Sequence, residues 1–442
     1  MLPLRRTHLT AVVAAAFALF TGAGRAEAAM DIQLWHAMPG ELGRQFERIV
    51  SGFNASQSLY RIVPMYKGSY TETVTAAIFA MRTRTHPAVV QVNEIATATM
   101  MAAKGAIYPV FELMQDAGEA FDTAQFLPAI AGFYTDLTGN LLSYPFNAST
   151  PILFYNKSMF REAGLNDKVA PRTWPEVEQA ARRLRRAGAS CGFSNHWPSW
   201  VHIENFSALH DLPLATQSNG LGGLNAELTI NNPALVRHVA ALAAWQKTKL
   251  FDYGGRGTTA EPKFQAGECG MFLGSSALNA EFRAKANFEI GYGLLPYWPD
   301  IRATAQNSMI GGASFWVLRG RPDGEYRGVA RFFAYLSQPE VQSDWHRSTG
   351  YLPITTAAYE LTRAKGFYES NPGAAIAIKQ VTLNTPTANS KAIRLGSFIL
   401  IRDVIEDELE QALSGKKTAK DALDTAVKRG NDLLRQFERA NK

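Results

Sequence analysis

The sequence predicts an α/β fold, in which strands alternate with helices along the chain. Within residues 31–92, three short strand-like runs enclose two segments whose apolar residues follow helical spacing. The third run, 88–92, is almost continuously apolar, as expected for a strand buried on both faces of a parallel sheet. We therefore expect a βαβαβ unit with a parallel sheet at the start of the folded chain.

The elements of this unit can be placed in order. We expect strands at 32–34, 60–66 and 88–92, with helices at 42–53 and 70–82 between them. The first helix presents one apolar face, formed by Leu42, Phe46, Ile49, Val50 and Phe53. That face predicts packing of the helix against the sheet.

The second half of the chain repeats the alternation. A strand at 152–155 precedes a helix that should begin at a capping box, in which Thr173 caps and Glu176 follows three residues later. Asn232 followed by Pro233 predicts another helix start. Further strands are expected at 270–274 and 315–318. The spacing of apolar residues in the C-terminal part of the chain predicts helices there.

The N-terminus predicts a secretory signal peptide over residues 1–28. Arg5 and Arg6 precede an apolar run at 9–20, and Ala26-Glu27-Ala28 provides a small-x-small cleavage site. The alternative is a membrane anchor, but the run is shorter than the roughly 20 residues that span a bilayer. The mature protein is therefore expected in the periplasm.

Composition limits the remaining possibilities. A chain of 442 residues exceeds one hydrophobic core, so two or three compact units are expected. The net charge of +6 is dispersed rather than gathered in a basic stripe, which argues against nucleic acid as a partner. Cys191 and Cys269 fall in strand-like runs and either pair as a disulfide or stay as buried thiols. No spacing of Cys and His indicates a metal site, and no cofactor is expected.

Small or polar residues follow several predicted strands. They are Asn93-Glu94, Ser275-Ser276 and Gly311-Gly312, and the polar stretch Asn147 to Thr150 directly precedes the strand at 152–155. Ligands of open α/β sheets bind at the carboxyl ends of strands. Ends of this kind that converge from two lobes would form one cleft, with the stretch 147–150 as a crossover between the lobes.

Several segments together carry a family resemblance: YKGSY at 66–70, TATMM at 97–101, PFNASTPILFYNK at 145–157, IGGAS at 310–314, TGYLPIT at 349–355, IRLG at 393–396 and GKKT at 415–418. In them the chain resembles the periplasmic glycerol-3-phosphate receptors of ABC importers, within the maltose-receptor-like superfamily. The resemblance implies a two-lobed type II solute-binding fold with a hinge and an interlobe cleft. The expected lobes are 29–147 with 311–350, and 148–310 with 351–442.

The resemblance also implies a set of ligand-binding residues: Tyr70, Glu94, Ser149, Ser275, Gly312, Tyr351 and Arg402. One position departs from the family pattern, because Ala148 stands where a second serine is expected beside the crossover serine. This departure would remove one hydroxyl donor from the site.

A phosphate ester requires hydrogen-bond donors, and part of this set supplies them. Arg402, the hydroxyls of Ser149 and Ser275 and the N–H of Gly312 fit that requirement. From sequence alone Arg402 also fits a solvated helix residue near Asp403 and Glu406, and Arg394 is the rival cation.

The remaining members of the set suit the glycerol hydroxyls. Glu94 would accept their hydrogen bonds, and Tyr70 and Tyr351 would each provide a ring wall and a hydroxyl. Four tryptophans are further candidates for stacking: Trp35, Trp174, Trp197 and Trp200. Trp35 and the loop 197–200 are the expected cleft walls, whereas Trp174 suits packing at a helix start.

The resemblance implies a monomeric receptor without enzymatic activity. It would capture sn-glycerol-3-phosphate, with glycerophosphocholine as a related ligand, and deliver it to two permease subunits and the ATPase subunits of an importer. An oligosaccharide receptor of the same fold is the alternative. An exported hydrolase of phosphodiesters is disfavoured, because the histidines form no metal-binding spacing with acids and no G-x-S-x-G motif is present.

Overall fold

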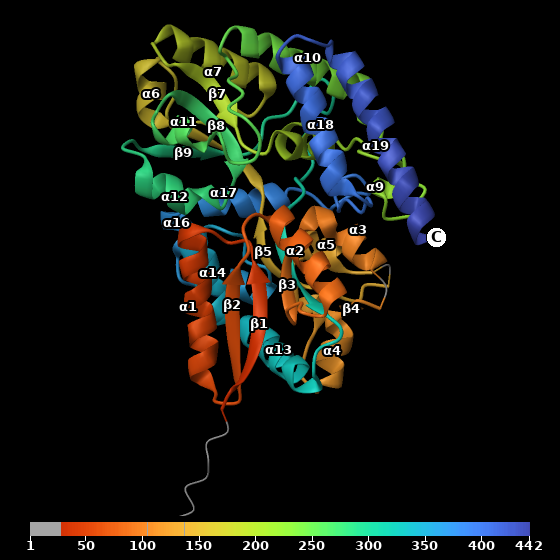
Figure 1. Cartoon of the computed structure of the whole chain (residues 1–442). Coiled ribbons are helices and arrows are strands. Elements are labelled where there is room, and N and C mark those ends of the chain that lie inside the picture. Colours follow the sequence, from red (N-terminus) through yellow and green to blue (C-terminus); the bar gives the residue numbers. More distant parts are fainter. Residues whose placement is uncertain (1–27, 104, 137) are drawn as a thin grey trace, which may run out of the picture.

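The computed structural model describes residues 28–103, 105–136 and 138–442, which form two lobes, each built on its own sheet (Figure 1). This arrangement confirms the predicted two-lobed α/β fold. Apart from residue 28, the predicted signal peptide lies outside the described residues. Within the described part of the chain, no helix is both long and apolar enough to cross a membrane.

The sheet of lobe 1 has the strand order β2-β1-β3-β10-β4, and β5 also pairs with β10. β1 is parallel to both β2 and β3, as the predicted βαβαβ unit requires. β10 comes from late in the chain and runs antiparallel to β3, β4 and β5. The strands are β1 (Met30–His36), β2 (Tyr60–Tyr66), β3 (Val89–Asn93), β4 (Ile107–Tyr108), β5 (Tyr144–Ser149) and β10 (Gly311–Leu318).

Helices cover this sheet on the sides that its apolar residues face. α1 buries Phe46, Ile49 and Phe53 against the sheet, as its apolar face predicts, and α13 packs on β1 and β2. The helical elements of lobe 1 are α1 (Gly40–Ser56), α2 (Tyr70–Thr83), η1 (Glu94–Ala96), α3 (Thr97–Ala102), α4 (Val110–Asp116), η2 (Thr123–Gln125), α5 (Pro128–Tyr134), α13 (Asp323–Leu336) and α14 (Pro339–Thr349).

The sheet of lobe 2 has the strand order β7-β8-β6-β9. Its strands are β6 (Pro151–Asn156), β7 (Cys191–Asn195), β8 (Cys269–Ser275) and β9 (Ile290–Gly293). Apart from α13 and α14 of lobe 1, the helical elements that follow β6 are α6 (Lys157–Glu162), α7 (Trp174–Arg186), η3 (Trp200–Glu204), α8 (Asn205–Leu209), α9 (Thr216–Asn219), α10 (Pro233–Lys247), α11 (Glu261–Gln265), α12 (Leu278–Lys285), α15 (Thr356–Ala364), α16 (Phe367–Ser370), α17 (Pro372–Val381), α18 (Phe398–Leu413) and α19 (Ala419–Asn441).

The predicted helix starts of lobe 2 are confirmed. The hydroxyl of Thr173 accepts a hydrogen bond from the backbone N–H of Glu176, whose carboxylate accepts one in return from the N–H of Thr173. The side chain of Asn232 caps α10 by accepting from the N–H of Leu235. These caps satisfy N–H groups that have no partner inside a helix.

The chain passes between the lobes at three places. Thr150 is the single residue between β5 and β6, and its carbonyl accepts from the N–H of Ser276 at 2.8 Å. The second passage precedes β10. The third lies between α14 and α17, because α15 still packs on α14 of lobe 1, whereas α17 packs on β6 and β9 of lobe 2. The expected lobe boundaries therefore remain a prediction along this last segment.

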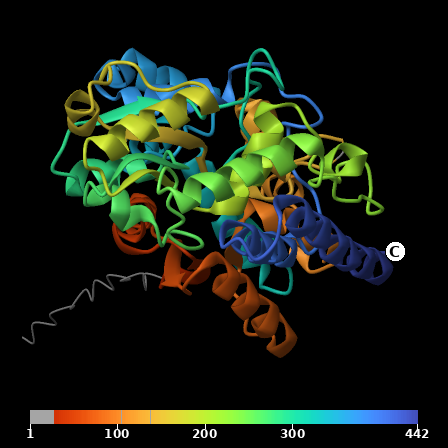
Figure 2. The same ribbon diagram turned by 90° about the horizontal axis from the view of Figure 1, so that it is seen from above.

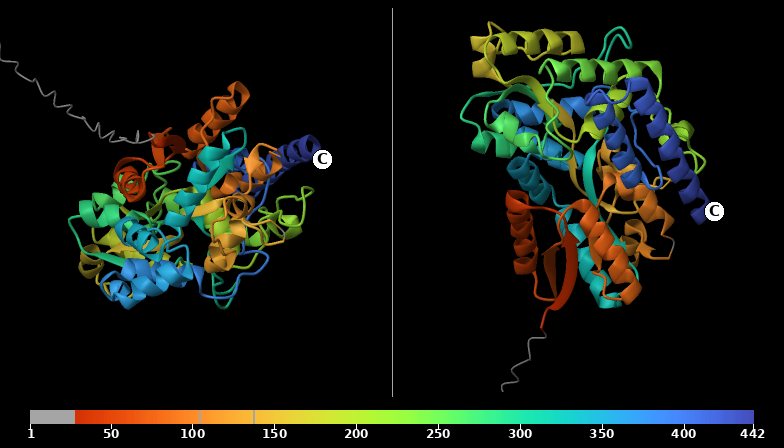
Figure 3. Two further views of the ribbon diagram at one scale, coloured as in Figure 1. Left: turned by 90° about the horizontal axis from the view of Figure 1, so that it is seen from below. Right: turned by 45° about the horizontal axis from the view of Figure 1, so that its top comes forward.

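The C-terminal helices connect lobe 2 to lobe 1. α10 packs against both α18 and α19, which lie together on one side of the molecule (Figure 2). α18 also contacts η1 of lobe 1. The right-hand view of Figure 3 shows the blue C-terminal helices running down beside the orange elements of lobe 1.

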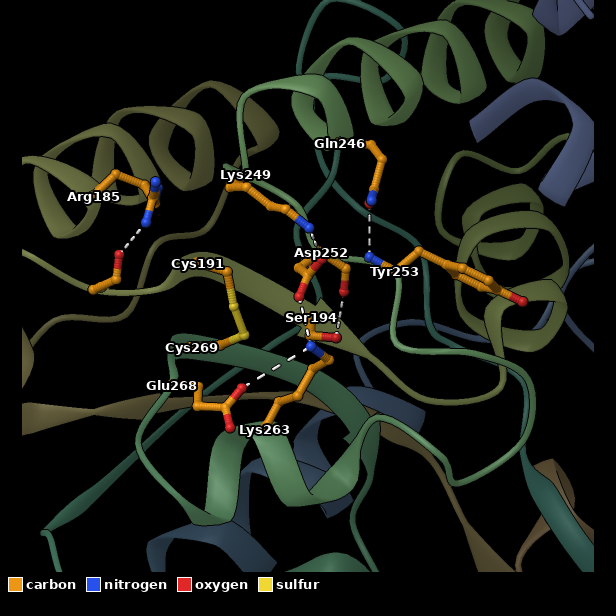
Figure 4. The surroundings of a disulfide bond; sticks show 11 residues. Arg185, Cys191, Ser194, Gln246, Lys249, Asp252, Tyr253, Lys263, Glu268 and Cys269 are labelled. Carbon is orange, nitrogen blue, oxygen red and sulfur yellow. Dashed lines mark hydrogen bonds and ion pairs between the residues drawn. A yellow bond between two sulfur atoms is a disulfide. The ribbon is translucent and has the colours of Figure 1, made fainter. Parts of the chain in front are cut away.

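A disulfide joins Cys191 of β7 to Cys269 of β8, which settles the alternative left open by the sequence (Figure 4). The two cysteines are register partners on adjacent parallel strands, with their Cα atoms 4.6 Å apart. Nearby, the carboxylate of Asp252 accepts from Lys249 and Lys263, both at 2.7 Å. The bond therefore ties together the first residues of two adjacent strands of lobe 2.

We expect the Cys191→Ser/Cys269→Ser variant to unfold at a lower urea concentration. The disulfide closes a loop with a sequence separation of 78, and restricting such a loop in the unfolded chain is worth about 4 kcal/mol. Urea unfolding followed by circular dichroism should show the same decrease in midpoint when dithiothreitol is added to the wild type. The midpoint of the double variant should not respond to the reductant. Equal unfolding midpoints for the oxidised wild type and the variant would contradict this expectation.

Gly312 of β10 lies where two strands approach closely. Its φ is +121°, and a Cβ atom there would lie 1.9 Å from the carbonyl oxygen of Asn147. Both the backbone conformation and the space therefore require glycine at this position.

We expect Gly312→Ala to destabilise the protein more than Gly139→Ala in thermal unfolding. Gly139 has a φ of +91° but no atom within 4 Å of a Cβ, so it isolates the conformational cost, about 1–2 kcal/mol. At Gly312 the clash with β5 adds to that cost. Equal decreases in the two melting temperatures would show that the close approach to Asn147 is unimportant.

Candidate functional site

A cavity of about 110 Å³ lies between the lobes, next to the crossovers. All seven residues predicted as ligand-binding line it, which brings together positions from 70 to 402 in the chain. The complete lining consists of Tyr70, Asn93, Glu94, Ser149, Trp197, Trp200, Ser275, Gly311, Gly312, Tyr351 and Arg402.

Element ends place most of these side chains. Tyr70 opens α2, directly after Ser69, which forms a capping box with Glu72. Glu94 follows the last residue of β3, and Ser149 and Ser275 end β5 and β8. The lining thus forms where strands and helix starts of the two lobes meet, as ligand sites of α/β folds do.

Arg402 carries the positive charge of the cavity and is 7% exposed. Its Nε and Nη2 atoms donate to the two carboxylate oxygens of Glu204 at 2.8 and 2.7 Å, and Nη2 also donates to Glu94 at 3.3 Å. Burial opposes the charge, but these carboxylates outweigh burial and raise the pKa of Arg402. The alternative of a solvated helix residue is therefore wrong.

Glu94 belongs to lobe 1 and joins Arg402 to the crossover. Its second oxygen accepts from the backbone N–H of Gly312 at 3.1 Å. Burial raises the pKa of Glu94, although the neighbouring Arg402 opposes that shift. The N–H of Gly312, which the sequence suggested as a phosphate donor, is thus engaged by Glu94 in this structure.

Other donors of the cavity are unengaged. Within the described residues, Nη1 of Arg402 and the hydroxyl of Ser149 have no hydrogen-bond partner, although both residues line the cavity. The Ser275 hydroxyl accepts from the N–H of Ala277 at 3.2 Å, which leaves its own proton available. The N–H of Ser275 donates to Nε2 of His196 at 2.6 Å. One guanidinium nitrogen, Nη1 of Arg402, and two hydroxyls are therefore available to an anion.

Two phenols line the cavity, those of Tyr70 and Tyr351, and the buried amide of Asn147 supports Tyr70 from behind the lining. The side-chain amide of Asn147 donates to the hydroxyl of Tyr70 at 2.9 Å, and its oxygen accepts from Gln91 at 2.8 Å. Burial raises the pKa of Tyr70 well above its usual value and that of Tyr351 to about 12. Both phenols thus stay protonated and can donate to a ligand oxygen.

Two of the four candidate tryptophans reach the cavity. Trp197 adopts a φ of +45°, and its N–H donates to the carbonyl of Gly257 at 2.8 Å. The ring of Trp200 lies against Gly311, where a Cβ atom would approach it to 2.7 Å. The indole N–H of Trp200 is buried and has no partner within the part of the chain described.

The other two tryptophans lie elsewhere. Trp35 packs under α2, and the ammonium of Lys67 lies 4.2 Å from its ring centroid, so its expected position as a cleft wall is wrong. Trp174 packs against Phe193 and His238 in the core of lobe 2, as a residue at a helix start was expected to do.

Two further expectations are corrected. Arg394, the rival cation, donates to the carbonyl oxygen of Thr135 at 2.7 Å, just after the end of α5, and does not line the cavity. Ala148 is buried in the hydrophobic core and is also absent from the lining. Alanine in place of the serine of the family pattern at position 148 therefore removes no hydroxyl from the cavity lining.

Glu204 was missed by the sequence reasoning. It precedes Arg402 by 198 residues and ends η3, an irregular π-helical turn with no periodicity that points to a site. Asn93 was noted only as part of a strand end, yet its side-chain oxygen is buried without a partner among the described residues. The described residues contain no group of three or more potential metal ligands.

Comparison with known proteins accounts for this architecture. A model of the bacterial extracellular solute-binding protein family matches residues 48–376. Proteins named sn-glycerol-3-phosphate-binding periplasmic protein UgpB are similar over their full length. That of Salmonella paratyphi A is 47% identical over 443 residues, 100% of both chains. That of Yersinia enterocolitica is 46% identical over 440 residues, 99% of both chains.

Solved structures show the same fold at low sequence identity. UgpB from Mycobacterium tuberculosis, in complex with glycerophosphocholine, is 20% identical with a TM-score of 0.77, covering 92% of this chain and 99% of that one. Maltose-bound MalE3 from T. maritima is 18% identical with a TM-score of 0.72, covering 92% and 100%. The chain therefore belongs to the family of bacterial extracellular solute-binding proteins.

Proposed function

We propose that this protein is a periplasmic receptor that captures sn-glycerol-3-phosphate and delivers it to an ABC importer, without catalysing a reaction. The observation that carries the proposal is the position of Arg402. Its guanidinium is buried, its Nη1 atom is unengaged among the described residues, and Ser149 and Ser275 line the same cavity. The full-length similarity to proteins named for binding this ligand supports the same conclusion.

The two ends of the ligand would contact different parts of the lining. The phosphate suits Nη1 of Arg402 and the two serine hydroxyls, because charge-assisted hydrogen bonds to a phosphate are strong. The glycerol hydroxyls suit the carboxylate of Glu94 and the phenols of Tyr70 and Tyr351, which supply acceptors and donors. The ligand would then contact both lobes at once.

Contacts with both lobes make binding and closure one process. A ligand that touches Glu94 of lobe 1 and Arg402 of lobe 2 binds the closed form more tightly than an open one and so shifts the population toward closure. Hinge motion at the crossovers, of which Thr150 is the narrowest, would accompany this shift. The closed form is the one that would be presented to two permease subunits and, through them, to the ATPase subunits.

Glycerophosphocholine is a second candidate ligand, favoured by the aromatic wall. Trp197 and Trp200 line the same cavity as Arg402. Tryptophan faces attract quaternary ammonium groups through cation–π interactions. A neutral oligosaccharide, the ligand of the alternative receptor class, would form no charge-assisted hydrogen bond with Nη1 of Arg402.

We expect Arg402→Ala to lower the affinity for sn-glycerol-3-phosphate by about 30- to 100-fold in calorimetric titrations, since a charge-assisted hydrogen-bonding group is lost. Because this change leaves the carboxylate of Glu204 buried without a cation, the paired variant Arg402→Met/Glu204→Gln repeats the test with that carboxylate removed. Glu94 then loses its contact with Arg402 but keeps the hydrogen bond from the N–H of Gly312. The matched control is Arg394→Ala, which removes the rival cation outside the cavity and should retain wild-type affinity. Competition by maltose in the wild type would instead favour the oligosaccharide class.

We expect Trp197→Ala to weaken glycerophosphocholine more than sn-glycerol-3-phosphate. Loss of a cation–π contact of about 0.5–2 kcal/mol corresponds to roughly a 2- to 30-fold change in affinity for the choline ester alone. Parallel titrations of both ligands give the ratio. Trp174→Phe, in the core of lobe 2, is the control that should leave this ratio unchanged, and a proportional loss for both ligands would argue against choline recognition by Trp197.

A further inference from the structure

The charges around the cavity are unbalanced for a phosphate monoester. Among the residues that line it in the described structure, Arg402 is the only cation, and it already pairs with Glu94 and Glu204. A monoester adds about −1.5 to −2 charges at neutral pH. The guanidinium would then face two carboxylates and a phosphate, and uptake of a proton by a nearby carboxylate would reduce this excess of negative charge.

Glu406 is placed to accept that proton. It lies on α18 one turn after Arg402, where residues four apart share a helix face, and it is 5% exposed. One of its carboxylate oxygens is buried without a hydrogen-bond partner among the described residues. The other lies 3.9 Å from Nε of Arg256.

The groups around Glu406 give it little stabilisation as an anion. Arg402 and Asp403 lie on the same helix as Glu406, and Glu204 faces it from η3. Arg256 and Tyr253 face it from the loop between α10 and α11. The guanidinium of Arg256 is engaged mainly by other carboxylates, those of Glu410 and Asp407, each at 2.7 Å. Burial raises the pKa of Glu406 to about 7, although Arg402 and Arg256 oppose that shift.

We propose that the carboxylate of Glu406 takes up one proton from solvent when a phosphate monoester binds at Arg402. An anion beside Arg402 competes with Glu406 for the field of the same guanidinium, which favours the neutral carboxyl group. A proton joins a carboxylate oxygen, and no other bond forms or breaks. The inference rests on the proposed function, since it requires that a phosphate ester occupies this cavity.

Proton uptake by Glu406 on binding determines how the affinity for the phosphate monoester changes with pH. With a pKa of about 7 in the free protein, Glu406 holds about 0.1 proton at pH 8. The proposal requires that the bound anion raises the pKa of Glu406 well above 8, in which case binding takes up nearly one proton at this pH. The contribution of this group makes the affinity fall by about tenfold between pH 6 and pH 8. The monoester itself, with a second pKa of about 6, is almost entirely dianionic at pH 8.

The test is calorimetric titration of the wild type with sn-glycerol-3-phosphate at pH 8, in two buffers of different ionisation enthalpy. The difference in observed enthalpy divided by the difference in buffer enthalpy gives the number of protons exchanged. We expect an uptake of about 0.8 to 0.9 proton for the wild type. Binding without proton uptake would overturn the inference while leaving the proposed function intact, whereas absence of binding would overturn the proposed function itself.

Three variants assign the proton to its residue. Glu406→Gln should bind sn-glycerol-3-phosphate with an uptake near zero, and Glu406→Asp, which keeps a carboxyl group, should retain uptake. Asp403→Asn removes an exposed carboxylate from the same helix and should retain the wild-type uptake. Unchanged uptake in Glu406→Gln would place the proton on the ligand or on another carboxyl group and would overturn the assignment to Glu406.

Discussion

The structure depends on how one buried guanidinium, that of Arg402, is satisfied. Burial of a charge is tolerated only when partners and hydrogen bonds replace water, and here Glu204 from the same lobe provides two hydrogen bonds. Glu94 from the opposite lobe provides a third contact at 3.3 Å. The pairing therefore fixes the side chain within lobe 2 and gives lobe 1 an electrostatic contact across the cleft. A ligand anion enters this arrangement and changes its charge balance.

The crossovers explain why so small a cavity gathers residues from the whole chain. With Thr150 alone between β5 and β6, the ends of two sheets lie within one residue of each other. β10 brings Gly311 and Gly312 to the same place from a later part of the chain, and there glycine allows β5 to approach. Ser149 and Ser275, the last residues of β5 and β8, line the cavity at this place. The position of the site is thus a property of the connectivity and not of one motif.

The sequence predicted the fold class and several polar strand ends, because strand periodicity, caps and strand-end residues are local signals. The ligand set required the family resemblance, since the sequence alone favoured a solvated helix residue for Arg402. The sequence could not predict which groups engage one another across long separations. Glu204 on an irregular turn, and the engagement of the Gly312 N–H by Glu94, depend on tertiary placement. The buried position of Ala148 likewise follows from strand pairing, which the sequence does not specify residue by residue.

The helix α18 holds two walls of the cavity. It carries Arg402 itself, and through Asp407 and Glu410 it holds Arg256, whose neighbour Gly257 accepts the backbone N–H of Trp197. Contacts with the same helix thus position the charged wall, formed by Arg402, and the aromatic wall, to which Trp197 belongs. Because both walls depend on contacts with α18, we expect that substitutions on this helix outside the lining can change ligand preference without replacing any lining residue.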